Sequence, residues 1–205
     1  LKKATADGKV ILSGRTTEVA GTCVTVTLEG RRPLVTEVQA LVTKSTLATP
    51  RRATSGLDSA RVAMILAVLD KRAAAPIGGS DAYLSTVGGV RLTEPAADLA
   101  ITLALAGAIT DRPLPNGTIA FGEVGLAGEI RPVTGAHRRL AEAHRLGFTR
   151  AVVPPGVVGA GPGLGCGFRE GGHILGSAII ELWSTWQGDT RKVVYYYRAS
   201  PDQRR

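Results

Sequence analysis

Residues 91–106 read RLTEPAADLAITLALA, a polar opening followed by a run of apolar residues. Thr93 can cap a helix with its hydroxyl, and Pro95 fits the first turn, where the missing N–H is not needed. The stretch therefore predicts an apolar helix over 94–109. The first turn holds the small pair Ala96 and Ala97, so the positive end of the helix has no reactive side chain beside it.

Two strands are predicted before this helix. Residues 21–30 alternate with the two-residue period of a half-buried strand. One face would carry Cys23, Thr25 and Thr27, and the other Val24, Val26 and Leu28. Residues 34–43 form the second strand, and the link from Gly30 to Pro33 predicts a hairpin.

The remaining pattern alternates helices with strands. A helix through 56–72 would be capped by Thr54 or Ser55 and end at Lys71 and Arg72. A strand is predicted over 81–90. Residues 118–133 are predicted to form a strand, a Gly-rich turn and a second, short strand. A helix over 135–147 and a strand over 148–154 follow. The order predicts an α/β or α+β domain with helices packed on a mixed sheet, filling 9–155 within a first domain of 1–155.

The composition changes after Pro155. Residues 156–172 are rich in glycine but lack GxxxxGK[ST], which favours a flexible linker over a phosphate-binding loop. The segment RKVVYYYR (191–198) could stack on nucleic-acid bases, but its β-branched and aromatic residues favour a strand. We predict that 156–205 is a Gly-rich linker and an atypical C-terminal extension.

Charge and cysteine content limit the class of protein. A formal charge of +8 and a pI near 10.0 favour polyanionic partners, although a solvated surface explains such an excess equally well. Cys23 and Cys166 lie far apart and no CxxC is present, so neither a disulfide framework nor a metal site is expected. No apolar run reaches a membrane-spanning length and no export signal is present, which predicts a cytoplasmic protein. The missing initiator Met suggests a piece of a longer chain.

Three stretches together carry a family resemblance: TPRRATSGLDSARVAMILAVLDKR (49–72), VGGVRLTEPAADLAITLALA (87–106) and IAFGEVGLAGEIRPVTGAHRRLAEAHRLGF (119–148). Over about 9–155 they resemble the C-terminal Lon-protease-like domain of the RadA (Sms) family of bacterial DNA repair proteins. The tail after 155 does not resemble this family. The resemblance implies a Lon-like fold for the first domain.

The wider resemblance to Lon peptidases concerns two motifs. In Lon a catalytic Ser lies in Gly-Pro-Ser-Ala-Gly at a helix start, and a general-base Lys follows in Gly-Gly-Leu-Lys. EPAAD (94–98) and GEVGLAGEIRPVTGAH (122–137) match these regions and place Ala96 at the Ser position and His137 at the Lys position. A methyl group cannot act as a nucleophile. Asp98, in place of the second Gly, adds a carboxylate where an oxyanion would be stabilised, which also disfavours acyl transfer. The fragment is therefore expected not to be an enzyme.

The resemblance also implies a parent protein and its partners. Members of the family are expected to be DNA-dependent ATPases that form homo-hexameric rings, act on branched DNA and work with a RecA-type recombinase. ATP, magnesium and zinc would bind upstream of this module, which itself would need no cofactor and would act near the nucleoid.

Arginine binds phosphate through a planar fork of donors. Basic residues in predicted loops and helix ends are the candidate DNA contacts: Arg31, Arg32, Arg51, Arg52, Lys71, Arg72, Arg91, Arg131, Arg138 and Arg139. Non-specific DNA binding with ring assembly is the first hypothesis. An active Lon-type Ser–Lys peptidase and a purely structural oligomerisation domain are the alternatives.

Overall fold

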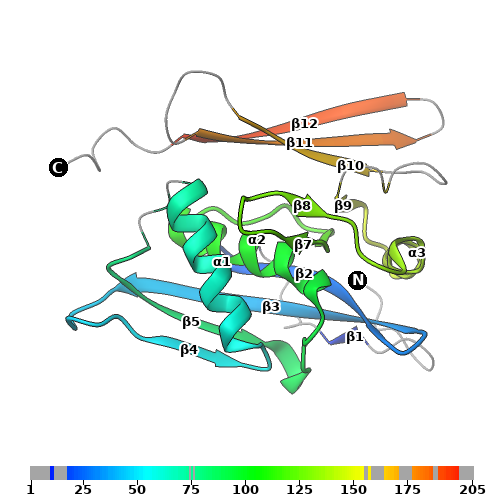
Figure 1. Cartoon of the computed structure of the whole chain (residues 1–205). Coiled ribbons are helices and arrows are strands. Elements are labelled where there is room, and N and C mark those ends of the chain that lie inside the picture. The colour runs from blue at the N-terminus through cyan, green and yellow to red at the C-terminus, as the bar shows by residue number, and fades with distance from the viewer. Residues whose placement is uncertain are drawn as a thin grey trace.

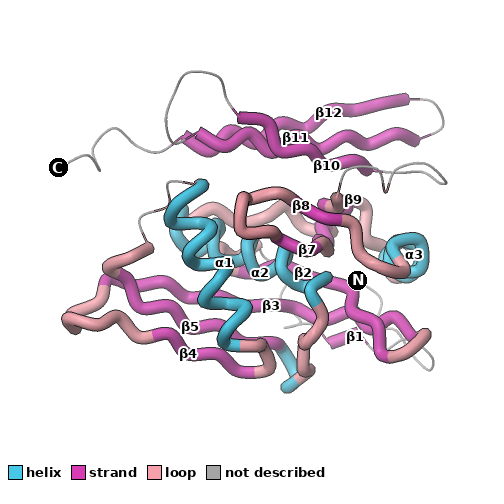
Figure 2. The backbone as a smooth tube through the Cα atoms, viewed as in Figure 1, coloured by secondary structure: helices cyan, strands magenta, loops and turns pink. Residues whose placement is uncertain are grey.

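One mixed sheet forms the framework of the domain (Figures 1 and 2). The computed structural model describes residues 10–11, 18–73, 75, 77–154, 157, 164–170, 177–186 and 189–198. Six strands lie in the order β4-β5-β3-β2-β6-β9, and β1 pairs with β3 in parallel. Their bounds are β1 Val10–Ile11, β2 Thr22–Glu29, β3 Arg32–Lys44, β4 Arg52–Ser55, β5 Ser80–Thr86, β6 Thr118–Ala120 and β9 Arg150–Val152. The predicted mixed α/β class is confirmed.

The hairpin of β2 and β3 lies at the centre of this sheet. The two strands pair antiparallel from Thr22↔Gln39 to Glu29↔Arg32, which confirms the predicted hairpin. The expectation of a half-buried β2 is wrong, because Thr25 and Val26, on opposite faces, are both fully buried. Both faces of β2 are covered, since α2 packs on one and α3 on the other.

Helix α1 spans Ser59–Arg72 and ends in the predicted pair Lys71 and Arg72. Its cap is Asp58, whose carboxylate accepts the backbone N–H of Arg61 at 2.9 Å. The predicted caps, Thr54 and Ser55, lie instead in β4, a strand that the sequence did not predict. Strand β4 runs parallel to β5 at one end of the sheet.

The helix predicted over 94–109 begins in two steps. After β5, the 3₁₀ turn η1 spans Val87–Gly89; a second, η2, spans Pro95–Ala97 and leads directly into α2, Asp98–Thr110. Pro95 takes the first position as expected. Thr93 does not cap the helix, because Glu94 precedes η2 and no side chain caps either η2 or α2. Helix α2 is buried along most of its length, as its apolar sequence requires.

Two apolar layers enclose the sheet. Helices α1 and α2 cover one face, packing on residues such as Val38 and Leu84. Helix α3, Ala136–Arg145, covers the β2, β6 and β9 part of the other face, around Ile119 and Phe121. Between β6 and α3 the chain forms a small hairpin of β7, Glu123–Val124, and β8, Ile130–Arg131, as the Gly-rich turn predicted.

The C-terminal part contains a second sheet. Strands β10 Leu164–Glu170, β11 Ser177–Trp186 and β12 Asp189–Arg198 pair antiparallel in sequence order. Strand β12 includes 191–198, so the strand predicted there is confirmed. Strand β10 falls inside the segment interpreted as a Gly-rich linker. The division of the chain at residue 155 stays a prediction.

Candidate functional site at the start of α2

The turn η2 is fixed by the backbone of Gly122, which follows β6. The Gly122 N–H donates to the Ala96 carbonyl at 2.8 Å, and the Gly122 carbonyl accepts the Leu99 N–H at 3.0 Å. The Ala96 side chain is only 2% exposed. A buried methyl group therefore occupies the position that the resemblance assigned to a nucleophile.

Glu94, immediately before η2, forms a buried ion pair with Arg139 of α3. Two guanidinium nitrogens of Arg139 donate to the two carboxylate oxygens of Glu94, each at 2.7 Å. The same carboxylate accepts the Thr27 hydroxyl at 2.6 Å and the Leu28 N–H at 2.9 Å. Arg139 also donates to the carbonyls of Thr134 and Val26. This network joins α3, β2 and η2.

The partners of Glu94 determine its protonation. Burial alone would raise the pKa of this carboxyl, but hydrogen bonds from Arg139, Thr27 and the Leu28 backbone, together with the charge of Arg139, outweigh burial and lower it. A carboxyl whose pKa is lower in the folded state stabilises the fold above its unfolded pKa. That contribution is lost as the pH falls through the folded pKa.

Asp98 forms a second ion pair on the other side of Ala96. Its carboxylate is 1% exposed and accepts two donors from the guanidinium of Arg61 on α1. It also accepts the Val124 N–H from β7 at 3.1 Å. Asp98 was expected to interact with the positive end of the helix, and it does lie in the first turn of α2. Its carboxylate, however, binds Arg61 and the Val124 N–H. Both carboxylates of EPAAD, Glu94 and Asp98, therefore connect the start of α2 to arginines of neighbouring helices.

His137 is the position that the resemblance assigned to a general base. It lies in the first turn of α3 with an exposed side chain, and forms no hydrogen bond or ion pair with the other described residues. Two positions later, the buried Arg139 side chain binds the Val26 carbonyl and the carboxylate of Glu94, which lies just before η2. Burial raises the pKa of the Cys23 thiol, with a smaller contribution from the charge of Glu37, which disfavours the thiolate form.

The structure divides the predicted DNA contacts by exposure. The prediction that Arg139 contacts DNA is corrected, because its side chain is 0% exposed and binds Glu94 and the carbonyls of Thr134 and Val26, so it cannot reach a phosphate. The others are exposed: Arg31, Arg32, Arg51, Arg52, Lys71, Arg72, Arg91, Arg131 and Arg138. Among these, Arg52 donates to the carbonyls of Ile77 and Ser80, and Arg131 pairs with Glu123 and Glu129.

The exposed cations do not form one continuous patch. Arg31 and Arg32 lie at the β2–β3 turn. This turn is near the start of α3, because Gly135, just before α3, lies against Leu28 near the end of β2: a Cβ atom on Gly135 would be 2.6 Å from the Leu28 side chain. Arg138 is in the first turn of that helix. We call Arg31, Arg32 and Arg138 the hairpin group. Lys71 and Arg72, at the end of α1, form a second pair next to the β7–β8 turn, where a Cβ on Gly128 would be 3.6 Å from Arg72.

Two further expectations concern metals and membranes. In the part of the chain that the structure describes, no three His, Cys, Asp or Glu side chains gather as a metal site. Over the same residues, no helix has both the length and the apolar character needed to cross a bilayer.

Comparison with known proteins places the chain among named relatives. Residues 88–156 match a family model described as subunit ChlI of Mg-chelatase. "DNA repair protein RadA" of Mycolicibacterium smegmatis is 60% identical over 155 residues, which are 76% of this chain and 33% of that protein. The protein of the same name from Mycobacterium tuberculosis (strain H37Rv) is 57% identical over 76% of this chain, which covers 32% of that protein. The one from Escherichia coli (strain K12) is 45% identical over 75% of this chain, which covers 34% of that protein. The chain is therefore related to DNA repair protein RadA over three quarters of its length and spans about a third of the curated relatives it matches.

Proposed function

We propose that this chain is a non-proteolytic, Lon-like module of a RadA-type DNA repair and recombination protein. The module binds DNA without sequence specificity and supports ring assembly. The parent is a DNA-dependent ATPase acting on branched DNA with a RecA-type recombinase, in the cytoplasm near the nucleoid. ATP, magnesium and zinc bind to parts of the parent outside this module.

The start of α2 is the observation that supports a loss of peptidase chemistry. A Ser–Lys peptidase needs a hydroxyl, a desolvated base beside it and free donors for the oxyanion. Here the matching positions hold the buried Ala96 and the exposed His137, and Asp98 accepts the Val124 N–H. The matching positions thus hold neither a hydroxyl nor a buried base, and a carboxylate lies at the helix start, which supports a loss of peptidase activity.

The double variant Ala96→Ser/His137→Lys tests this conclusion. We expect no hydrolysis of casein or of unstructured peptides above the unmodified chain, because position 137 faces solvent and Asp98 remains at the helix start. Peptide cleavage is followed by mass spectrometry, with a commercial serine peptidase as positive control. Hydrolysis by the unmodified chain would support the alternative of an active Lon-type peptidase instead.

The exposed cations support DNA binding. Side chains of this kind contact phosphates and position a protein on DNA without reading its sequence. The hairpin group joins three cations from two elements at one end of the sheet, and α3 adds its positive N-terminal end there. Lys71 and Arg72 supply a second contact region.

Fluorescence anisotropy with a labelled duplex and a labelled single strand at several salt concentrations tests the DNA interface. In Arg31→Ala/Arg138→Ala we expect weaker binding and a log–log salt slope smaller by about 2 on duplex DNA, close to one unit per phosphate contact. The matched control is Arg112→Ala, which removes an exposed cation just after α2. Negligible binding by the unmodified chain at low salt would favour a purely structural oligomerisation domain.

A further inference from the structure

The ion pair of Glu94 and Arg139 joins the two elements that carry the hairpin group. Glu94 accepts the N–H of Leu28 at 2.9 Å, one residue before the end of β2, where the chain turns into β3. Its two carboxylate oxygens also bind Arg139, which follows Arg138 directly in α3. One carboxylate therefore connects the strand that leads into the β2–β3 turn with the helix that carries Arg138.

Contacts on several sides fix the Arg139 side chain. Its guanidinium also donates to the carbonyl of Val26 in β2 and to that of Thr134 just before α3. The guanidinium carbon lies 5.8 Å from the centre of the Phe121 ring. Because the planar guanidinium offers its donors in a fixed fork, these partners set the position of α3 on β2. The backbone of Arg138, the preceding residue, is positioned with it.

The hairpin group presents cations from two elements at one end of the sheet (Figure 1). Arg31 in the β2–β3 turn and Arg138 in α3 are exposed, and neither side chain pairs with an acid in the part of the chain that the structure describes. Cations on two separate elements bind one duplex most strongly when their spacing is set beforehand, because ordering them on binding costs affinity. The joint action of Arg31 and Arg138 therefore depends on what connects α3 to β2.

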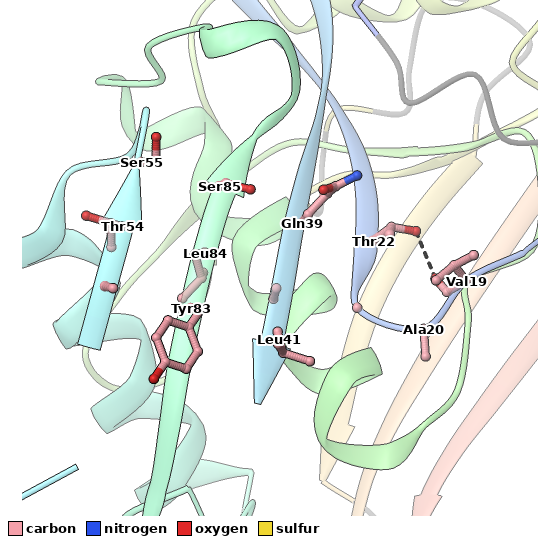
Figure 3. A pocket seen from close by; sticks show the side chains of 13 residues that line it. Val19, Ala20, Thr22, Gln39, Leu41, Thr54, Ser55, Tyr83, Leu84 and Ser85 are labelled. Carbon is pink, nitrogen blue, oxygen red and sulfur yellow. Dashed lines mark hydrogen bonds between the residues drawn. The ribbon is translucent and has the colours of Figure 1, made fainter. Parts of the chain in front are cut away.

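A concave surface elsewhere on the sheet differs from the hairpin group in charge. Strands β2, β3, β4 and β5 line a hollow of about 390 Å³, and Tyr83, Gln39 and Ser85 are among its side chains (Figure 3). All the described residues that line this hollow are uncharged. Cationic side chains supply most of the affinity for the phosphates of DNA. The hairpin group is therefore the surface on which phosphate binding is tested.

We infer that Glu94 is a positioning residue for DNA binding: through Arg139 it fixes α3 against β2, so that Arg31 and Arg138 contact phosphates of one duplex together. The inference rests on the DNA binding in the proposed function and names the residue that organises it. Glu94 itself carries a negative charge, which by itself repels DNA. Its positioning role and its charge therefore have opposite effects on affinity, and this difference makes the role measurable.

Glu94→Gln in the full 205-residue chain tests the inference, by fluorescence anisotropy with a labelled duplex at several salt concentrations. The substitution raises the net charge by one, so charge alone predicts tighter binding. We expect binding at least about threefold weaker and a log–log salt slope smaller by about 1, because α3 is no longer fixed and a phosphate contact is lost. Asp111→Asn, at an exposed position that ends α2, is the matched control. It raises the net charge equally and should bind at least as tightly as the unmodified chain.

Two further variants separate positioning from a general loss of structure. In the Arg31→Ala/Arg138→Ala background, Glu94→Gln should weaken binding no further, because the two cations that it positions are gone. Arg139→Met/Glu94→Gln removes the whole ion pair at constant net charge and should bind DNA as weakly as Glu94→Gln. This variant provides the test if circular dichroism shows that Glu94→Gln does not fold.

The outcomes distinguish the inference from the proposed function. A folded Glu94→Gln or Arg139→Met/Glu94→Gln that binds DNA as tightly as the unmodified chain, or more tightly, would overturn the inference and leave DNA binding standing. Equal weakening by Glu94→Gln in the unmodified and the Arg31→Ala/Arg138→Ala backgrounds would also overturn it, since a general structural effect does not depend on those cations. Negligible binding by the unmodified chain at low salt would overturn the proposed DNA binding together with the inference.

Discussion

Replacing Arg139 by methionine is expected to lower the free energy of unfolding by about 3–5 kcal/mol, the cost of breaking a buried ion pair from one side. The guanidinium is 0% exposed and supplies two donors to Glu94 and others to the carbonyls of Val26 and Thr134. Methionine fills similar space but donates nothing, so Glu94 keeps only the donors from Thr27 and Leu28, and the two carbonyls lose the donors from Arg139. Urea denaturation followed by circular dichroism measures the change.

Two variants serve as controls for this prediction. Arg138→Met removes the neighbouring, exposed arginine and should change stability by less than about 0.5 kcal/mol. Arg139→Met/Glu94→Gln should recover part of the loss, because the unpaired carboxylate is removed. The difference in stability between the unmodified chain and Arg139→Met should also narrow as the pH falls through the lowered pKa of Glu94, because the protonated carboxyl no longer contributes as an ion pair. A loss below about 1 kcal/mol at neutral pH would contradict the role assigned to Arg139.

The substitution Asp98→Ala is expected to lower the free energy of unfolding by about 3 kcal/mol, less than Arg139→Met. Its carboxylate is 1% exposed and binds Arg61 and the Val124 N–H, so its removal disconnects α1 and β7 from the start of α2. Arg61 is 26% exposed and can turn towards water, which limits the cost. The midpoint of thermal unfolding gives the measurement.

Asp98→Asn is the matched comparison for this second pair. An asparagine keeps an oxygen that can accept the Val124 N–H but loses the charge opposite Arg61, so its stability should lie between those of the unmodified chain and Asp98→Ala. If Asp98→Asn and Asp98→Ala lose the same amount of stability, the effect comes from the ion pair with Arg61 alone. An unchanged stability in Asp98→Ala would show that α1 and β7 are held without this carboxylate.

Local patterns predicted much of the framework. Alternation over 21–30, the glycine at the turn and the return strand indicated the β2–β3 hairpin, since strand period and turn chemistry are properties of neighbouring residues. The apolar run after EPAAD indicated α2 for the same reason. Strand β4 was missed because its four residues are too few to establish an alternation, and pairing with β5 defines it.

The sequence by itself determined that positions 96 and 137 carry no Ser–Lys pair, because chemical identity does not depend on the fold. It could not separate Arg138 from Arg139. Successive residues of a helix point about 100° apart, and only the packing of α3 on β2 decides which of them meets Glu94, 45 positions away. The tertiary structure likewise decided that both carboxylates of EPAAD bind arginines from other helices. These features depend on contacts between distant segments, which no local pattern contains.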